Sequence, residues 1–181
     1  MRFQSVLVAL VVAASAAIAS PYVKRDGGAV LADVNAFGPA FDKFGNACAA
    51  FPSAGGTVAQ ANTIMGTVQV LNTAIKKATT DANRSPPYSQ AESVAIVNTT
   101  RNLEGKFTDG LSKLKAKRAA LVVLPGIQPL VVNGLSSLKN ATIAFWAAFL
   151  PKSSSDQISS AEGTFGFYVG GYDDAIKFIN N

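Results

Sequence analysis

The side chains that most often carry enzyme chemistry are scarce in this chain. The sequence contains no histidine and a single cysteine, Cys48. Neither a serine–histidine–aspartate nor a cysteine–histidine nucleophilic arrangement can form, and the commonest zinc ligand is missing. Asp173 and Asp174 are the only adjacent carboxylates, but neighbours on a helix point about 100° apart and cannot act on one bond. We therefore expect no enzymatic activity, no metal site and no cofactor.

Glycines and basic residues give no stronger sign of a polar site. Gly163-x-x-Gly166 and Gly170-Gly171 follow no strand pattern and precede no lysine–serine or lysine–threonine pair, so they do not indicate a phosphate-binding loop. A basic cluster is best interpreted as a solvated helix face, although phosphate, an anionic glycan or a lipid headgroup would also suit it. No aromatic residue lies within the cluster's core to stack on bases, so nucleic acid is not an expected partner. The cluster comprises Lys106, Lys113, Lys115, Lys117 and Arg118.

The first 25 residues predict export from the cell. Arg2 precedes an apolar run, and Ala17-Ile18-Ala19 is a small-x-small pattern typical of signal peptidase cleavage, so residues 1–19 are expected to form a signal peptide. The run is shorter than the roughly 20 residues that span a bilayer, and no transmembrane segment is expected. Lys24-Arg25 resembles a site for a kexin-type processing protease, which makes residues 20–25 a short propeptide and 26–181 the mature domain. The expected location is extracellular or cell-wall associated.

Removal of residues 1–25 lowers the net charge, and without a disulfide the stability of the mature domain depends on its core. The chain has 16 basic and 11 acidic residues, and three of the basic ones lie in the leader, so a net charge of +5 falls to +2. A lone Cys48 excludes an intramolecular disulfide, and we expect a buried, inert thiol. Asn98 and Asn140 begin Asn-x-Thr sequons and are candidate glycosylation sites, whereas the Asn83 sequon is weakened by the proline that follows it.

Apolar residues recur at spacings of three and four, which predicts helices from end to end. We expect helices over about 29–51, 57–83 and 89–121, a fourth that ends before Pro151, and a fifth capped by one of three serines and reaching residue 179. Gly38-Pro39 should kink the first helix or mark its start, and Ser89 with Glu92 should form a capping box. Short connections favour antiparallel neighbours. The predicted fold is all-α, a single-domain up-and-down bundle of about five helices.

Two features of the last helices bear on binding. Four glycines, at positions 163, 166, 170 and 171, interrupt the fifth helix at a cost of about 1 kcal/mol each, and close helix packing is favoured over a ligand groove as the reason. In the fourth helix, Ile143, Phe145, Trp146, Phe149 and Leu150 cover roughly 160° of the circumference, more than the usual stripe of about 100°. Such a helix either lies centrally in the bundle or faces an apolar ligand.

The chain has a signal peptide, a Lys-Arg site followed by Asp26, and a cysteine-poor helical domain that ends in a tyrosine-containing helix. In this combination it resembles the fungal hydrophobic surface binding protein A family. That family includes cell-wall galactomannoprotein antigens. The resemblance covers about residues 29–179 and rests on pattern and composition. It implies a secreted or wall-associated glycoprotein that binds hydrophobic surfaces or captures a fatty acid or other lipid in an apolar interior.

Expected site residues follow from the helical pattern of this chain. Lys106 or Lys113 is the expected contact for a ligand carboxylate, and cell-wall polysaccharide is a further candidate partner. One alternative is a structural or antigenic wall glycoprotein with a fully packed core and no ligand. Another is adsorption to hydrophobic surfaces by opening of the bundle. The expected apolar lining is Met65, Phe107, Leu111, Phe145, Phe149, Phe165, Tyr168 and Tyr172.

Overall fold

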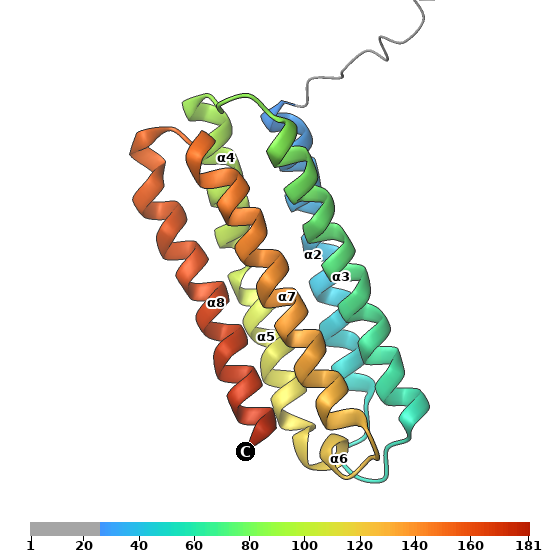
Figure 1. Cartoon of the computed structure of the whole chain (residues 1–181). Helices are drawn as coiled ribbons and strands as arrows, with labels where there is room; N and C mark the ends of the chain where they lie inside the picture. The colour runs from blue at the N-terminus through green and yellow to red at the C-terminus, as the bar shows by residue number, and fades with distance from the viewer. Residues whose placement is uncertain (1–25) are drawn as a thin grey trace, which may run out of the picture.

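The computed structural model describes residues 26–181, and every regular element in that range is a helix, as predicted. The predicted signal peptide and propeptide lie outside the described residues. Five columns form the bundle in Figure 1, and a short helix and two 3-10 turns join them. The columns are α2 (Gly27–Ala50), α3 (Val58–Arg84), α4 (Gln90–Asn102) continued by α5 (Glu104–Ala116), α7 (Ile127–Phe149) and α8 (Ile158–Asn180). The connectors are α6 (Arg118–Val122), η1 (Leu150–Lys152) and η2 (Ser155–Gln157).

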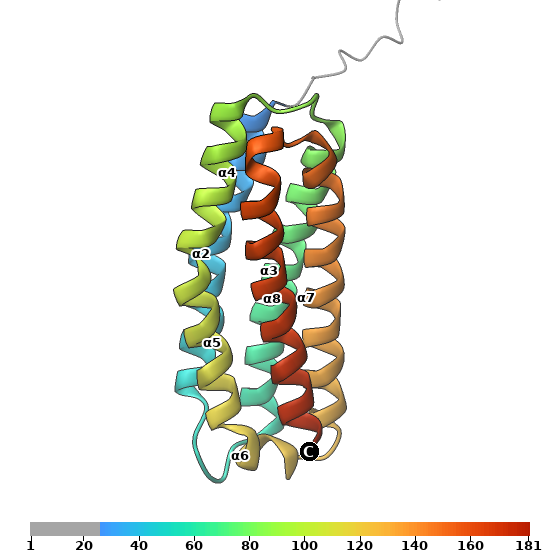
Figure 2. The same ribbon diagram turned by 90° about the vertical axis from the view of Figure 1, so that its left-hand side faces the viewer.

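The chain alternates in direction along the bundle axis from one column to the next (Figures 1 and 2). The columns close into a ring: α2 packs on α3, α3 on α7, α7 on α8, α8 on α5, and α5 and α4 on α2. Consecutive columns are therefore not always neighbours, because the chain crosses the top of the bundle between α3 and α4. The expectation of antiparallel neighbours holds for α2 with α3 and α7 with α8, but α5 runs parallel to both α2 and α8.

Local capping explains where several helices begin. The predicted capping box is present: the Ser89 hydroxyl accepts from the Glu92 N–H at 3.3 Å, and the Glu92 carboxylate accepts from the Ser89 N–H at 2.8 Å. Thr57 and Gln60 form a second box at the start of α3. Glu92 also accepts from the Gly27 N–H at 3.0 Å, which ties the starts of α4 and α2 together.

Proline does not start or stop the first helix. Helix α2 begins at Gly27 and continues through Pro39, so a start at Pro39 was wrong. Pro39 and Asn35, whose carbonyl loses its helical donor, both lie on the exposed face. Water can therefore satisfy that carbonyl, and the buried face of the helix is undisturbed.

The third and fifth predicted helices differ from the structure at particular residues. The expected continuous helix over 89–121 is broken at Leu103 and Lys117, where each N–H bonds a carbonyl three residues back. No serine caps α8: the 3-10 turn η2 precedes it, and the side chain of its N-cap residue, Gln157, makes no capping bond to the helix backbone. The N–H of Ser154 instead donates to the Ser93 hydroxyl at 3.0 Å, which holds this connection against α4.

Helix α7 packs between α3 and α8. Phe145, Trp146 and Phe149 are buried, whereas Ile143 is 38% exposed and Leu150 is partly buried. The wide apolar surface of this helix is therefore mainly core packing, since α7 contacts both α3 and α8. Within residues 26–181, no helix combines the length and apolar character needed to cross a bilayer.

Candidate functional site

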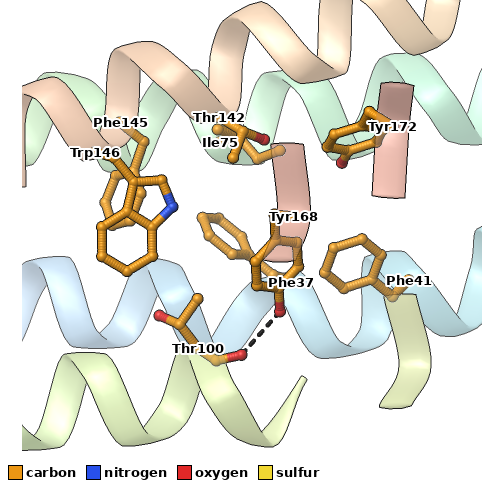
Figure 3. A pocket seen from close by; sticks show the side chains of 9 residues that line it. All are labelled: Phe37, Phe41, Ile75, Thr100, Thr142, Phe145, Trp146, Tyr168 and Tyr172. Atoms are coloured by element: carbon orange, nitrogen blue, oxygen red, sulfur yellow. Dashed lines mark hydrogen bonds between the residues drawn. The ribbon is translucent and has the colours of Figure 1, made fainter. Parts of the chain in front are cut away.

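A small cavity lies in the core between α2, α3, α4, α7 and α8 (Figure 3). Its volume is about 20 Å³, room for roughly one water molecule. Ligand pockets usually have about 300–1,000 Å³, so this cavity is too small to hold a fatty acid without expanding. The lining is almost entirely apolar and consists of Phe37, Phe41, Ile75, Thr100, Thr142, Phe145, Trp146, Tyr168 and Tyr172.

Aromatic rings close the cavity by packing on one another. Phe107 lies 4.7 Å from Tyr168, 5.0 Å from Tyr172 and 5.9 Å from Phe41, measured between ring centroids. On the far side, Phe145 packs edge-on against Trp146 at 5.6 Å. Each such pair contributes about 0.5–1.5 kcal/mol beyond its buried area. These ring contacts leave little free space in the cavity.

Two tyrosine hydroxyls enter this apolar region. The Tyr168 hydroxyl donates to the Thr100 carbonyl at 2.8 Å (Figure 3). The Tyr172 hydroxyl is buried, makes no hydrogen bond of normal length, and points towards Thr142 (Figure 3). Burial raises the pKa of both tyrosines, and for Tyr172 the Thr142 side chain opposes that rise only in part. Both hydroxyls are therefore neutral and offer hydrogen bonds without charge.

A larger hollow of about 400 Å³ lies between α5 and α8 on the surface, and we call it the α5–α8 groove. One end carries Lys115, whose ammonium lies 2.7 Å from the Asp174 carboxylate and lowers the pKa of that group. The other end is formed by Phe107, which also contacts the cavity residues. The groove therefore joins a charged end to an apolar one. Its lining is Phe107, Thr108, Leu111, Ser112, Lys115, Phe167, Gly171 and Asp174.

Gly171 brings α8 close to α5 at the apolar end of the groove. A Cβ at this position would lie 2.5 Å from the Phe107 ring, so an added side chain would displace the ring. The expectation of close packing therefore holds for Gly171. It fails for Gly163, Gly166 and Gly170, where an added Cβ would meet nothing within 4 Å.

A third hollow, of about 680 Å³, lies between α3 and α7 and is open to solvent. Lys76, Asn140 and several hydroxyl groups line it, and it offers no aromatic surface. Among residues 26–181 no cluster of three or more histidine, cysteine, aspartate or glutamate side chains could hold a metal ion. Cys48 is buried among apolar side chains, and burial raises its pKa to about 12.

The structure distributes the predicted lining residues over several places. Phe145, Tyr168 and Tyr172 line the cavity, while Phe107 and Leu111 line the α5–α8 groove. The other three lie elsewhere in or against the core: Met65 faces Gly134, Phe149 packs on Tyr88, and Phe165 packs on Trp146.

The two predicted carboxylate contacts do not line the cavity or the groove. Lys106 pairs with Asp42 of α2, and Lys113 pairs with Asp109 at 2.6 Å. The lysine that does reach the groove is Lys115. It belongs to the basic cluster recognised in the sequence, but the spacing alone did not separate it from its neighbours.

Sequence reasoning missed six cavity residues. Four of them had a signal, because they lie on apolar helical stripes: Phe37, Phe41, Ile75 and Trp146. Thr100 and Thr142 gave none as cavity residues, since each was considered only as the hydroxyl of a sequon. Asn98 and Asn140 themselves are exposed, as is Asn83.

Comparisons with known proteins agree on the fold. The chain is similar to AFMP4P, solved in complex with palmitic acid, with a TM-score of 0.79 and 20% identity over 85% of this chain and 99% of that one. It is also similar to ligand binding domain 1 of the Penicillium marneffei MP1 protein, complexed with arachidonic acids, with a TM-score of 0.72 and 19% identity over 83% and 93%. Domain 2 of the same protein, complexed with multiple arachidonic acids, gives 0.76 and 19% over 87% and 97%.

Sequence families give the more specific result. No curated protein matches the chain. The family model described as hydrophobic surface binding protein A matches residues 27–150, from the start of α2 to the end of α7. Helix α8 follows the matched range. Because the match spans most of the chain, this protein belongs to the hydrophobic surface binding protein A family.

Proposed function

We propose that this protein binds a fatty acid or another apolar ligand between its helices, without catalysing a reaction. The observation that carries the proposal is the aromatic-lined cavity at the centre of a bundle from this family. Proteins of similar fold hold palmitic and arachidonic acids. Burial of an acyl chain would supply affinity at about 25 cal/mol per Å² of apolar surface.

Binding requires the closed cavity to expand, and α8 is the helix best suited to move. Gly163, Gly166 and Gly170 face open space, and each lowers helix stability by about 1 kcal/mol relative to alanine. No packing contact offsets this cost. Local bending of α8 at these glycines would separate it from α5 and α7 and enlarge the space around Tyr168 and Tyr172.

Lipid release tests this function directly. The mature protein is purified from a secreting host, denatured, extracted and examined for lipid by mass spectrometry, with a mock-purified sample as control. Delipidated protein is then titrated with palmitate. Recovered fatty acid or saturable binding supports the proposal. Absence of both would instead support the alternative of a wall glycoprotein with a fully packed core, which the small cavity volume favours.

Adsorption to hydrophobic surfaces is the second candidate, and exposed aromatic side chains on α8 favour it. Phe167 and Phe178 are 43% and 45% exposed. Opening of α8 would add the core aromatics to this surface. Binding to hydrophobic beads with loss of near-ultraviolet circular dichroism and retention of far-ultraviolet signal would identify this mode. Replacement of both phenylalanines by serine should weaken adsorption to the beads.

Secretion and glycosylation complete the proposal. Residues 1–19 act as signal peptide, 20–25 as propeptide, and the product is extracellular or wall associated, with cell-wall polysaccharide as a further partner. Asn98 and Asn140 are exposed, but the threonines of their sequons, Thr100 and Thr142, are buried in the cavity wall. Glycans would therefore be added before the bundle closes. A mobility shift after glycosidase treatment of secreted protein, but no modification of refolded protein in vitro, tests this order.

A further inference from the structure

We propose that a fatty acid enters between α5 and α8, with its carboxylate bound by Lys115 and its acyl chain passing Phe107 into the core cavity. This inference rests on the proposed function and adds to it a headgroup site, an entrance and a gating side chain. The groove, the ion pair and the shared ring of Phe107 carry it.

The groove has the polarity of a fatty acid. Lys115 stands at one end and Phe107 at the other, eight residues apart on the same helix, which corresponds to roughly 12 Å along its axis. Leu111 lies one turn from each and continues the apolar wall between them. Across the groove, Phe167 and Gly171 of α8 complete that wall. An acyl chain longer than the groove must therefore continue past Phe107.

The charged end can accept a carboxylate at little cost. Lys115 and Asp174 have side chains 31% and 67% exposed, and exposed pairs of this kind are weak. A ligand carboxylate can therefore replace Asp174 at the Lys115 ammonium. Arg118 adds positive charge there: its guanidinium and the Lys115 ammonium each lie 5.9 Å from the Phe178 ring centroid. Among the described residues Arg118 has no acidic partner within 4 Å.

Phe107 separates the groove from the cavity. Its ring contacts Phe167 at 6.0 Å on the groove side and Tyr168 and Tyr172 on the cavity side. The ring also covers Gly171. Because Gly171 has no side chain, α8 adds no further obstacle between the groove and the cavity at this point. Rotation of this one ring joins the two spaces, and bending of α8 then gives the chain room inside.

The headgroup site is tested with two ligands that differ only at the polar end. Delipidated wild type, K115M and K139M are titrated with palmitate and with 1-hexadecanol, following Trp146 emission. Lys139 is the matched control, because its ammonium lies 2.6 Å from Asp173 of α8 with similar exposure but outside the groove. K115M should weaken palmitate binding about fivefold and leave hexadecanol unchanged, whereas K139M changes neither. D174N should strengthen palmitate binding about twofold.

The gate is tested by rates. In stopped-flow mixing, F107A should accelerate association of both ligands, since neither headgroup takes part in this step. F149A, which removes a core ring that does not line the groove, is the control for general loosening. Urea unfolding of each variant establishes that it is folded, and F107L provides a milder truncation if F107A is not.

The outcomes separate the inference from the function beneath it. Wild type that binds neither ligand contradicts the proposed function itself. Wild type that binds both, with K115M indistinguishable from K139M, overturns the entrance at α5 and α8 while the function stands. If Y172F, and not K115M, selectively loses palmitate binding, the carboxylate lies in the cavity. That result would also overturn the headgroup site at Lys115. Equal acceleration of association by F107A and F149A would contradict the role of Phe107 as the gate.

Discussion

Alanine substitutions at the glycines of α8 offer a sharp test of how this helix is built. Gly163, Gly166 and Gly170 are helical, and a Cβ added at each would meet no atom within 4 Å. Each substitution should therefore gain the propensity difference, about 1 kcal/mol, without a packing penalty. The triple variant should be about 2–3 kcal/mol more stable. In urea this corresponds to a midpoint increase of about 1 M or slightly more at an unchanged m value.

Gly171 is the internal control in the same helix. Its added Cβ would lie 2.5 Å and 2.7 Å from two atoms of the Phe107 ring. Overpacking of this kind typically costs about 1–3 kcal/mol, so G171A should be neutral or destabilising despite the better helix former. Equal stabilisation by G171A and G166A would refute the assigned contact with Phe107. A triple variant no more stable than wild type would refute the claim that three glycines face open space.

The same triple variant also tests whether α8 bends when a fatty acid enters the bundle. If α8 bends at these glycines when ligand enters, the substitutions penalise the open state, and palmitate association should slow by up to about 100-fold. Association at the wild-type rate, together with the expected gain in stability, would mean that α8 moves as a rigid rod. Stopped-flow mixing with delipidated protein measures this rate.

Three further results are expected elsewhere in the bundle. The Lys152 ammonium donates to the carbonyls of Ala82, Asn83 and Ser85 at 2.7–2.8 Å, so K152M should destabilise the protein by about 2 kcal/mol in urea unfolding. Burial raises the pKa of Cys48 from 9.0 to about 12, which reduces the thiolate fraction roughly a thousandfold. A disulfide reagent should therefore label Cys48 only when urea unfolds the chain. Fast labelling of the native protein would contradict this burial. Bonds from Ser89 and the Gly27 N–H lower the pKa of Glu92 below 4.5, so its stabilisation is present above that pH and lost as pH falls through the lowered pKa. E92Q keeps the capping box but removes the negative charge from the helix start, so it should cost about 0.3–1 kcal/mol at pH 7, and this difference should shrink towards pH 3.

Much of the fold follows from local chemistry in the sequence. The Ser89 and Glu92 capping box and the proline pair after Ser85 define boundaries that no tertiary contact has to supply. The breaks at Leu103 and Lys117 were not predicted, because no proline marks them. Each is a change of one residue in hydrogen-bond register, and Leu103 lies against Gly38 of α2, where a Cβ would be 3.3 Å from its side chain. Contacts of that kind depend on which helices are neighbours.

The site was predictable in composition but not in arrangement. Periodicity correctly indicated that Phe145, Tyr168 and Tyr172 are buried, because the spacing of three and four marks a core-facing stripe. It could not indicate which of Lys113 and Lys115 faces the groove. Residues two positions apart on a helix point about 200° away from each other, and only the ring order of α2, α5 and α8 decides which lysine meets the groove. Cavity volume depends on rotamers such as that of Phe107, which spacing does not encode.

Energy transfer from Trp146 tests the central claim most directly. This residue is the only tryptophan in the chain, is 1% exposed and lines the cavity. Delipidated protein is titrated with a fluorescent polyene fatty acid while tryptophan emission is recorded, and unlabelled palmitate is then added as competitor. A ligand inside the bundle predicts strong, saturable quenching of Trp146 that palmitate reverses. Emission that stays unchanged, or quenching that never saturates and resists palmitate, would contradict binding in the core.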